Sequence, residues 1–177
     1  AGGEYRQLKR TGTDQEVDQE DLLDGWGRAE FRPSGYVGIV IRAGAQERTP
    51  DKYDVTLAES FGENPLMRKF NMADRTRNTG EMRADFAATE SINIWLQVDA
   101  SADDYDNSAI GLTSGRELNL SGDVSMQLTE ATGLRLFANR QEIKSRQAGS
   151  QTFSTADWWA ESNDTINVLG VGAKHVV

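Results

Sequence analysis

The stretch Ser91-Ile92-Asn93-Ile94-Trp95-Leu96-Gln97-Val98-Asp99-Ala100 decides the fold. Aliphatic side chains occupy every second position from Ile92 to Val98, and polar or aromatic side chains fill the positions between them. Successive side chains of a β-strand point to opposite faces, so this period of two predicts a strand with one apolar face and one polar face.

The same alternation recurs along the chain. It is clear in Glu117–Leu128 and Gly133–Ile143 and weaker in Thr165–Val177. Two further segments, Tyr36–Arg48 and Glu81–Ala88, also alternate. Hairpin pairing then requires partners for Tyr36–Arg48, and the best candidates are Glu4–Arg10 and Gly25–Arg32. The sequence therefore predicts about eight strands.

The connections between these strands alternate between short and long. Tight turns are predicted at Arg32–Gly35, Thr89–Ser91 and Thr129–Thr132. The long connections are polar and mostly acidic, and they cover Thr11–Asp24, Pro50–Gly80, Ser101–Gly115 and Ser145–Asn163. Short turns at one end and long loops at the other are typical of an outer-membrane β-barrel, with periplasmic turns and extracellular loops. We therefore predict an all-β, antiparallel up-and-down meander that forms part of a large transmembrane barrel.

Composition agrees with this architecture. The chain has 177 residues, a formal charge of -9 and 37% hydrophobic residues, and its longest uncharged apolar run is Gly35–Ile41. That run is too short for a membrane-spanning helix, which needs about 20 residues, whereas a spanning strand needs only about 9–11. The chain opens on Ala1 without a basic and apolar leader. We expect residues 1–177 to be a single barrel segment from inside a longer protein.

The alternation divides the side chains of the three clearest strands into two groups. The predicted lipid-facing residues are Ile92, Ile94, Leu96, Val98, Leu118, Leu120, Val124, Met126, Leu128, Leu134 and Leu136. The predicted lumen- or partner-facing residues are Asn93, Trp95, Gln97, Asn119, Ser121, Asp123, Ser125, Gln127, Arg135, Asn139 and Gln141. The same alternation would also fit one wall of a soluble β-sandwich, and the asymmetry of the loops favours lipid.

Catalytic and cofactor chemistry has little support in the sequence. There is no Cys, which excludes disulfides, thiolate metal sites and covalent haem attachment through Cys-x-x-Cys-His. His175 is the single histidine, too few for a histidine-based zinc site, and we expect it to lie on the surface of a strand. The acidic loops argue against nucleic acid as a partner, because phosphate binding needs clustered Lys and Arg.

Two loops invite a binding interpretation. Asp103, Asp104 and Asp106 form a weak calcium candidate, because Ca²⁺ prefers several carboxylate oxygens; a solvated acidic loop is the simpler interpretation. Trp158 and Trp159 are adjacent in a long loop and would either pack on the barrel rim or contact a partner. The longest connection, around Val55–Arg77, is predicted to be a folded extracellular loop with short helical turns.

Three segments together resemble the MtrB/PioB family of outer-membrane β-barrel proteins. Arg68-Lys69-Phe70-Asn71-Met72-Ala73-Asp74-Arg75-Thr76-Arg77 is similar to the family's RKY-x-x-ADR-x-R signature. Asp103-Asp104-Tyr105-Asp106-Asn107-Ser108-Ala109-Ile110-Gly111-Leu112-Thr113 resembles its DDY-x-NS-x-x-GLT loop. Gln147-Ala148-Gly149-Ser150, followed by Asp157-Trp158, resembles its QAGS…DW loop. The resemblance covers about residues 36 to 174.

This resemblance implies a non-enzymatic sheath. Such a barrel surrounds a periplasmic decahaem or other multihaem cytochrome, which carries electrons across the outer membrane and often passes them to a cytochrome on the outer surface. The barrel itself binds no haem. A lumen of that width needs more than eight strands, because barrel diameter grows with strand number. The alternatives are a general diffusion porin and a soluble all-β binding module; a barrel hydrolase lacks a credible catalytic base.

Overall fold

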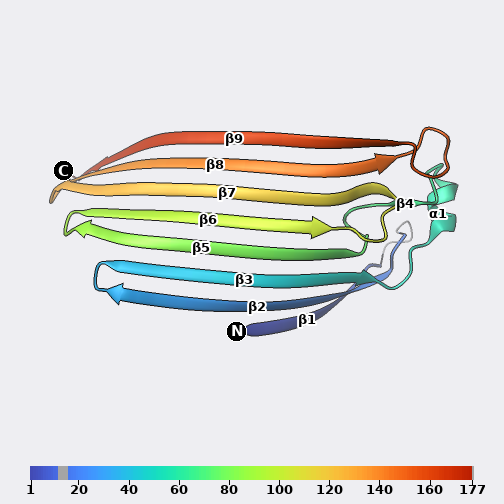
Figure 1. The fold of residues 1–177 in the computed structure, drawn as a ribbon, viewed down its shortest axis with the longest axis horizontal. Coiled ribbons are helices and arrows are strands. Elements are labelled where there is room, and N and C mark those ends of the chain that lie inside the picture. The colour runs from blue at the N-terminus through green and yellow to red at the C-terminus, as the bar shows by residue number, and fades with distance from the viewer. Residues whose placement is uncertain (12–15, 177) are drawn as a thin grey trace.

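The chain forms one antiparallel sheet in the computed structural model, which describes residues 1–11 and 16–176 (Figure 1). The described residues hold nine strands and one short helix. The elements are β1 (Gly2–Lys9), β2 (Gln19–Ser34), β3 (Val37–Pro50), α1 (Val55–Ser60), β4 (Met67–Arg68), β5 (Arg75–Thr89), β6 (Ile92–Asp104), β7 (Ile110–Thr129), β8 (Thr132–Gly149) and β9 (Trp158–His175). The described residues include no helix that is long and apolar enough to span a membrane.

Eight strands follow one another as neighbours in the order β1-β2-β3-β5-β6-β7-β8-β9, each antiparallel to the next. This confirms the predicted meander. The two-residue strand β4 is an addition that the sequence did not predict; it pairs in parallel with the start of β7. Within the described residues the outer strands β1 and β9 pair with only one neighbour each, so the sheet is open.

Turns and loops lie at opposite ends of the sheet (Figure 1). The predicted turns are confirmed, with turn residues at Gly35–Tyr36, Glu90–Ser91 and Glu130–Ala131. The loops are shorter than predicted. Most of Ser101–Gly115 is strand, because β6 runs to Asp104 and β7 begins at Ile110. The run Ser101-Ala102-Asp103-Asp104 has no apolar alternation to mark it as strand, and only its pairing with β5 and β7 shows that it belongs to β6. Asp14, at the centre of the first acidic loop, lies outside the described residues, as does Val177.

Register gives the sheet two chemically different faces. We define the apolar face as the one carrying Leu96 and the polar face as the one carrying Gln97. Leu96 pairs with Ala84 on one side and Gly122 on the other, so its own face continues from strand to strand. The two groups of residues predicted from the alternation fall on separate faces throughout β6, β7 and β8. The aliphatic row is not enclosed in a core, since Leu96 is 60% exposed.

The strands are staggered in a regular way. One line of paired residues crosses seven strands through Phe31, Ile39, Ala84, Leu96, Gly122, Ala138 and Leu169. On β2, β5 and β7, the turns begin four, six and eight residues beyond this line, at Gly35, Glu90 and Glu130. Successive turns are two strands apart, so the position of the turn shifts by about one residue per strand. With ~3.4 Å per residue and ~4.8 Å between strands, this corresponds to a strand tilt of about 35°.

Three aromatic rings on the polar face lie over glycines of the neighbouring strand. Phe137 covers Gly170, and Trp26 and Trp158 cover Gly2 and Gly149 in the same way. In each case a Cβ added to the glycine would collide with the ring. These glycines are therefore needed for close packing between a ring and a backbone rather than for an unusual backbone conformation.

We expect Gly170→Ala to lower the free energy of unfolding by about 1–3 kcal/mol, because the new methyl group would displace the Phe137 ring. Gly172→Ala is the matched control. It lies on the same strand and face, and its nearest neighbour would be the Cβ of Arg135 at 3.8 Å. Urea-induced unfolding of the parent protein in detergent micelles measures both changes. Equal effects of the two substitutions would contradict the ring-over-glycine packing.

Candidate functional site: the polar face and the loop-end cap

The centre of the polar face is a network of neutral and acidic side chains from β6, β7 and β8. Gln97 and Asn119 donate hydrogen bonds to the carboxylate of Asp99 at 2.9 and 3.2 Å. Asn139 donates to the side-chain oxygens of Asn119 and Ser121 at 2.6 and 2.8 Å. These side chains already satisfy one another, so the face presents a pre-organised hydrophilic surface.

Ion pairs continue this surface toward the turns. Arg83 donates to Asp85 at 2.7 Å, and its guanidinium lies 4.8 Å from the centre of the Trp95 ring. Arg135 pairs with Asp123, which is only 5% exposed. The cation–π contact accounts for an aromatic residue among polar neighbours, since the ring stabilises the charge above it.

The last strand departs from the simple pattern. Ile166 and Val168 of β9 pair with Gln141 and Asn139, so they lie on the polar face. On β8, Arg140 lies on the apolar face, paired with Leu120. Alternation is blurred in the sequence of β9, and only its pairing with β8 shows which side each residue takes.

The long loops fold together into a small cap at the loop end of the sheet (Figure 1). We define the loop-end cap as residues 16–18, 51–74, 105–109 and 150–157. Its hydrophobic core includes residues from the cap and from the adjoining strand ends. The buried apolar residues are Val17, Ala58, Met72, Ala73, Tyr105, Ile110 and Ala148. The cap is therefore a folded unit, as predicted for Val55–Arg77, although β4 replaces one of the two expected helical turns.

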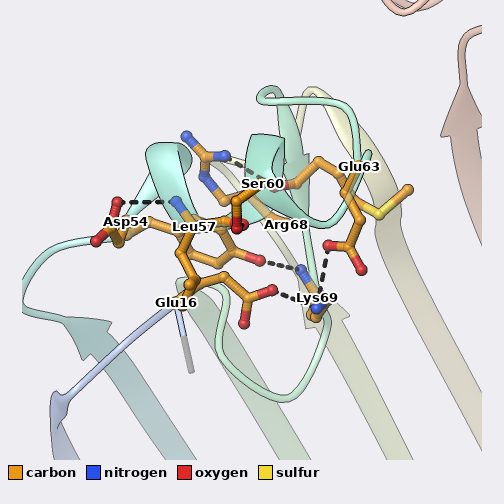
Figure 2. A network of polar contacts seen from close by, with 9 residues as sticks. Glu16, Asp54, Leu57, Ser60, Glu63, Arg68 and Lys69 are labelled. Carbon is orange, nitrogen blue, oxygen red and sulfur yellow. Dashed lines mark hydrogen bonds and ion pairs between the residues drawn. The ribbon is translucent and has the colours of Figure 1, made fainter. Parts of the chain in front are cut away.

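A buried carboxylate lies at the centre of the cap (Figure 2). Glu16 is 2% exposed and pairs with Lys69, which also contacts Glu63 at 3.0 Å. The hydrogen bond from Lys69 to Glu16 raises the pKa of the Lys69 ammonium above its ordinary value. This arrangement ties the first loop of the chain to the longest one.

Local contacts shape the longest loop around α1 (Figure 2). The carboxylate of Asp54 accepts hydrogen bonds from the backbone N–H groups of Thr56 and Leu57 at 2.9 and 3.2 Å, which caps the helix. Arg68 lies over the Tyr53 ring with its guanidinium 4.4 Å from the ring centre. Burial raises the pKa of the Tyr53 hydroxyl.

Arginines of the sheet hold the cap against the polar face. Arg48, on the polar face of β3, donates to the backbone carbonyl of Ala73 at 2.9 Å and also to that of Phe70. Arg10 donates to the carbonyl of Asn71 at 3.3 Å. The cap thus folds inward over the polar face. Sequence reasoning missed Arg48 and Glu16, because nothing local marks them as partners of a distant loop.

The three family-like segments of the sequence meet at this end of the sheet. Arg77 of the first segment forms a two-pronged ion pair with Asp103 of the second, both hydrogen bonds being 2.6 Å long. Gly111 of the second segment pairs with Arg68 of the first and with Ala148 of the third. The residues that carry the resemblance are therefore in direct contact.

The same residues match known proteins. The model of a family described as putative outer-membrane β-barrel porin, MtrB/PioB, matches residues 1–176. The chain belongs to the MtrB/PioB family. It is 28% identical over 174 residues to the outer membrane protein MtrB of Shewanella baltica (strain OS185), covering 98% of this chain and 25% of that protein. The chain therefore spans about a quarter of the length of this curated relative.

Membership in the MtrB/PioB family places the chain in the outer membrane and in a class of porin-like proteins. Without cysteine, this chain has no thioether attachment for haem. The calcium candidate finds no support: Asp103 is held by Arg77, and the described residues contain no cluster of three or more acidic or histidine side chains suited to a metal.

The remaining candidate residues lie at the two ends of the sheet. His175 is at the turn end, where its Nδ1 is 2.9 Å from the hydroxyl of Thr132. Trp158 packs over Gly149 on the polar face. Trp159 points to the apolar side and is 72% exposed, so rim packing is seen for Trp158 and a partner contact of Trp159 stays a prediction.

We expect Lys69→Gln to loosen the loop-end cap, because it leaves the buried Glu16 carboxylate without a cation. Loss of one partner of a fully buried pair costs about 3 kcal/mol, and because the Lys69 side chain is 34% exposed we expect a smaller loss, about 1–2 kcal/mol. Chymotrypsin, whose cleavage sites neither substitution removes, should cleave within residues 51–74 at pH 8 faster in the variant. Lys52→Gln, which replaces an exposed lysine of the same loop, should be cleaved at the same rate as the unmodified protein.

The stability that the Lys69–Glu16 ion pair gives to the loop-end cap should be lost at high pH. Because the pKa of Lys69 is raised in the fold, the ion pair contributes its full stability below the ordinary lysine pKa, about 10.5. That contribution is lost as the pH rises through the raised value. Near-UV circular dichroism of Lys69→Gln and of the unmodified protein between pH 8 and pH 12 measures this loss. A difference between the two proteins that stays constant over this range would contradict a stabilising Lys69–Glu16 ion pair.

Proposed function

We propose that this chain is a wall segment of a larger barrel, with its apolar face toward lipid and its polar face toward the lumen. The observation that carries the proposal is the two-faced sheet with regularly staggered strands. Its tilt of about 35° lies within the range of about 35–45° for outer-membrane barrels. The exposure of Leu96 and its neighbours fits a surface completed by lipid.

The height of the apolar face supports the same orientation. On β7 the outward aliphatic residues extend from Leu118 to Leu128, ten residue steps, and Arg116 follows on the loop side. Ten steps of ~3.4 Å in a strand tilted by about 35–40° correspond to a height of about 26–28 Å. The apolar band of an outer-membrane barrel is about 25 Å tall.

We infer that the lumen of the complete barrel encloses a multihaem c-type cytochrome and insulates it from lipid during electron transfer across the outer membrane. The polar face suits this role, because its side chains are hydrogen-bonded among themselves and present a hydrophilic wall to a soluble protein. The segment supplies eight of the strands, and the rest of the longer protein supplies the others. The turns face the periplasm and the loop-end cap lies outside, where a cytochrome of the outer surface would dock.

The alternative function is a general diffusion porin, which the description of the family favours. Purification of the full-length parent protein from its native membrane separates the two. We expect a haem-absorbing partner to copurify in a fixed ratio and the complex to have little ion conductance in a planar bilayer. A haem-free protein with high conductance would reject the sheath and support the porin.

The orientation of the faces has its own test. Leu96→Arg or Leu120→Arg should lower the free energy of unfolding in a bilayer by about 2–4 kcal/mol, since arginine near the midplane must meet hydrocarbon. Asn93→Arg and Ser121→Arg, on the opposite face of the same strands, should cost much less. Refolding of the parent barrel into lipid vesicles measures all four, and equal costs on the two faces would reject the orientation.

A further inference from the structure

A group of cations lies on the apolar face at the loop-side end of the aliphatic band. We define the basic patch as Arg116 of β7 and Arg140, Lys144 and Arg146 of β8. Arg116 is two residues beyond Leu118, and register places it on the same face. All four side chains belong to exposed residues. Arg116, Lys144 and Arg146 therefore lie at the loop-side edge of the proposed lipid surface, and Arg140 lies next to Leu120.

Two of these cations oppose each other directly. Arg116 pairs with Lys144 across the β7–β8 ladder. Like charges at directly opposite positions of an antiparallel pair destabilise a sheet. The other two have acidic partners: Arg140 contacts Glu142 at 2.7 Å and Arg146 contacts Glu161 at 2.6 Å. In the part of the chain that the structure describes, Arg116 and Lys144 have no ion-pair partner.

The patch surrounds a hollow of about 390 Å³ on the outer surface of the sheet. Arg116, Lys144 and Arg146 line it, together with Glu161, the ion-pair partner of Arg146, and the polar side chains of Ser114 and Asn163. Two cations without an acidic partner, Arg116 and Lys144, beside neutral hydrogen-bonding groups in an open hollow suit an anion with several acceptor oxygens, such as a phosphate group.

The positive charge is local. In the neighbouring strand β6, the apolar-face position paired with Ser114 is Asp104, and in β3 the corresponding region carries Glu47. The chain as a whole has a formal charge of -9. General solubility therefore does not explain a concentration of arginine and lysine on two adjacent strands.

We propose that the basic patch binds the phosphate groups of lipopolysaccharide in the outer leaflet. The proposal rests on the orientation proposed above, in which the apolar face meets lipid and the loops lie outside. Arg116 lies about 7 Å along the strand beyond the aliphatic band, at the level where lipid headgroups begin. A phosphate between Arg116 and Lys144 would remove their repulsion. Trp159, exposed on the same face, matches the aromatic belt expected at such an interface.

The experiment uses the full-length parent protein in detergent, titrated with diphosphoryl lipid A and monitored by native mass spectrometry. Each cation near an anionic headgroup contributes about fivefold to affinity, so R116Q/K144Q should weaken binding about 25-fold. K52Q/K174Q removes two positive charges elsewhere and should leave the affinity unchanged. The affinity of the unmodified protein for dephosphorylated lipid A should be as low as the affinity of R116Q/K144Q for diphosphoryl lipid A.

Equal affinity of the unmodified protein and R116Q/K144Q for diphosphoryl lipid A would overturn the proposal, as would equal binding of dephosphorylated lipid A. Displacement of lipid A by millimolar inorganic phosphate would indicate an adventitious anion site and would also overturn it. A spin label at Leu120→Cys separates this failure from that of the orientation. Collisions of the label with oxygen rather than with a water-soluble nickel chelate show lipid contact, whatever the patch binds.

Discussion

The structure depends on an unbroken ladder of backbone hydrogen bonds across eight antiparallel strands. Because side chains alternate with a period of two, a slip of one residue would move every aliphatic side chain of a strand to the other face. The register shifts recorded in the sheet lie near its ends, for example between Phe31 and Ser34 and between Gln127 and Thr129. From Leu118 to Val124 on β7, and at the paired positions from β3 to β9, the register is continuous, and this continuity keeps the faces separate. A membrane-spanning sheet must pair its backbone N–H and C=O groups with one another. The same ladder therefore both pairs the backbone groups and keeps the two faces separate.

The loop-end cap is stabilised by a small hydrophobic core of its own. A single loop at the end of an open sheet buries few side chains, and this chain forms a core there by packing four connections together. Glu16 with Lys69 joins the first connection to the longest, and Arg48 fixes the longest connection to the polar face. The family-like segments are conspicuous in the sequence because they contribute to this packing. Their contacts in this chain are structural, and they shape the entrance to the side that we propose as the lumen.

Charge is distributed according to depth and face. On the polar face, cations and carboxylates are interleaved as ion pairs, such as Arg83 with Asp85, so no single sign dominates. This suits the lumen wall that we propose, which would hold and insulate a protein rather than steer it. On the apolar face, charge is concentrated near the loop side, where Arg116 and Lys144 oppose each other just beyond the band and Arg140, paired with Glu142, lies beside Leu120. Such a boundary would hold the barrel at a fixed height in the membrane, because moving it would bring either charge into hydrocarbon or aliphatic side chains into water.

The sequence by itself determined the long strands from β3 onward, the meander and the division of Ile92–Ala100 and its neighbours into two groups, because the period of two is a local property that packing did not override. It could not separate strand from loop where small and acidic residues mix, as at Asp103 and Asp104, since a strand end paired with arginines resembles a solvated loop. The side taken by Ile166, the contact of Arg48 with a loop 22 to 25 residues away and the opposition of Arg116 and Lys144 were decided only by the tertiary structure. Each depends on pairing between distant segments, and register between strands is fixed by the whole sheet rather than by either strand.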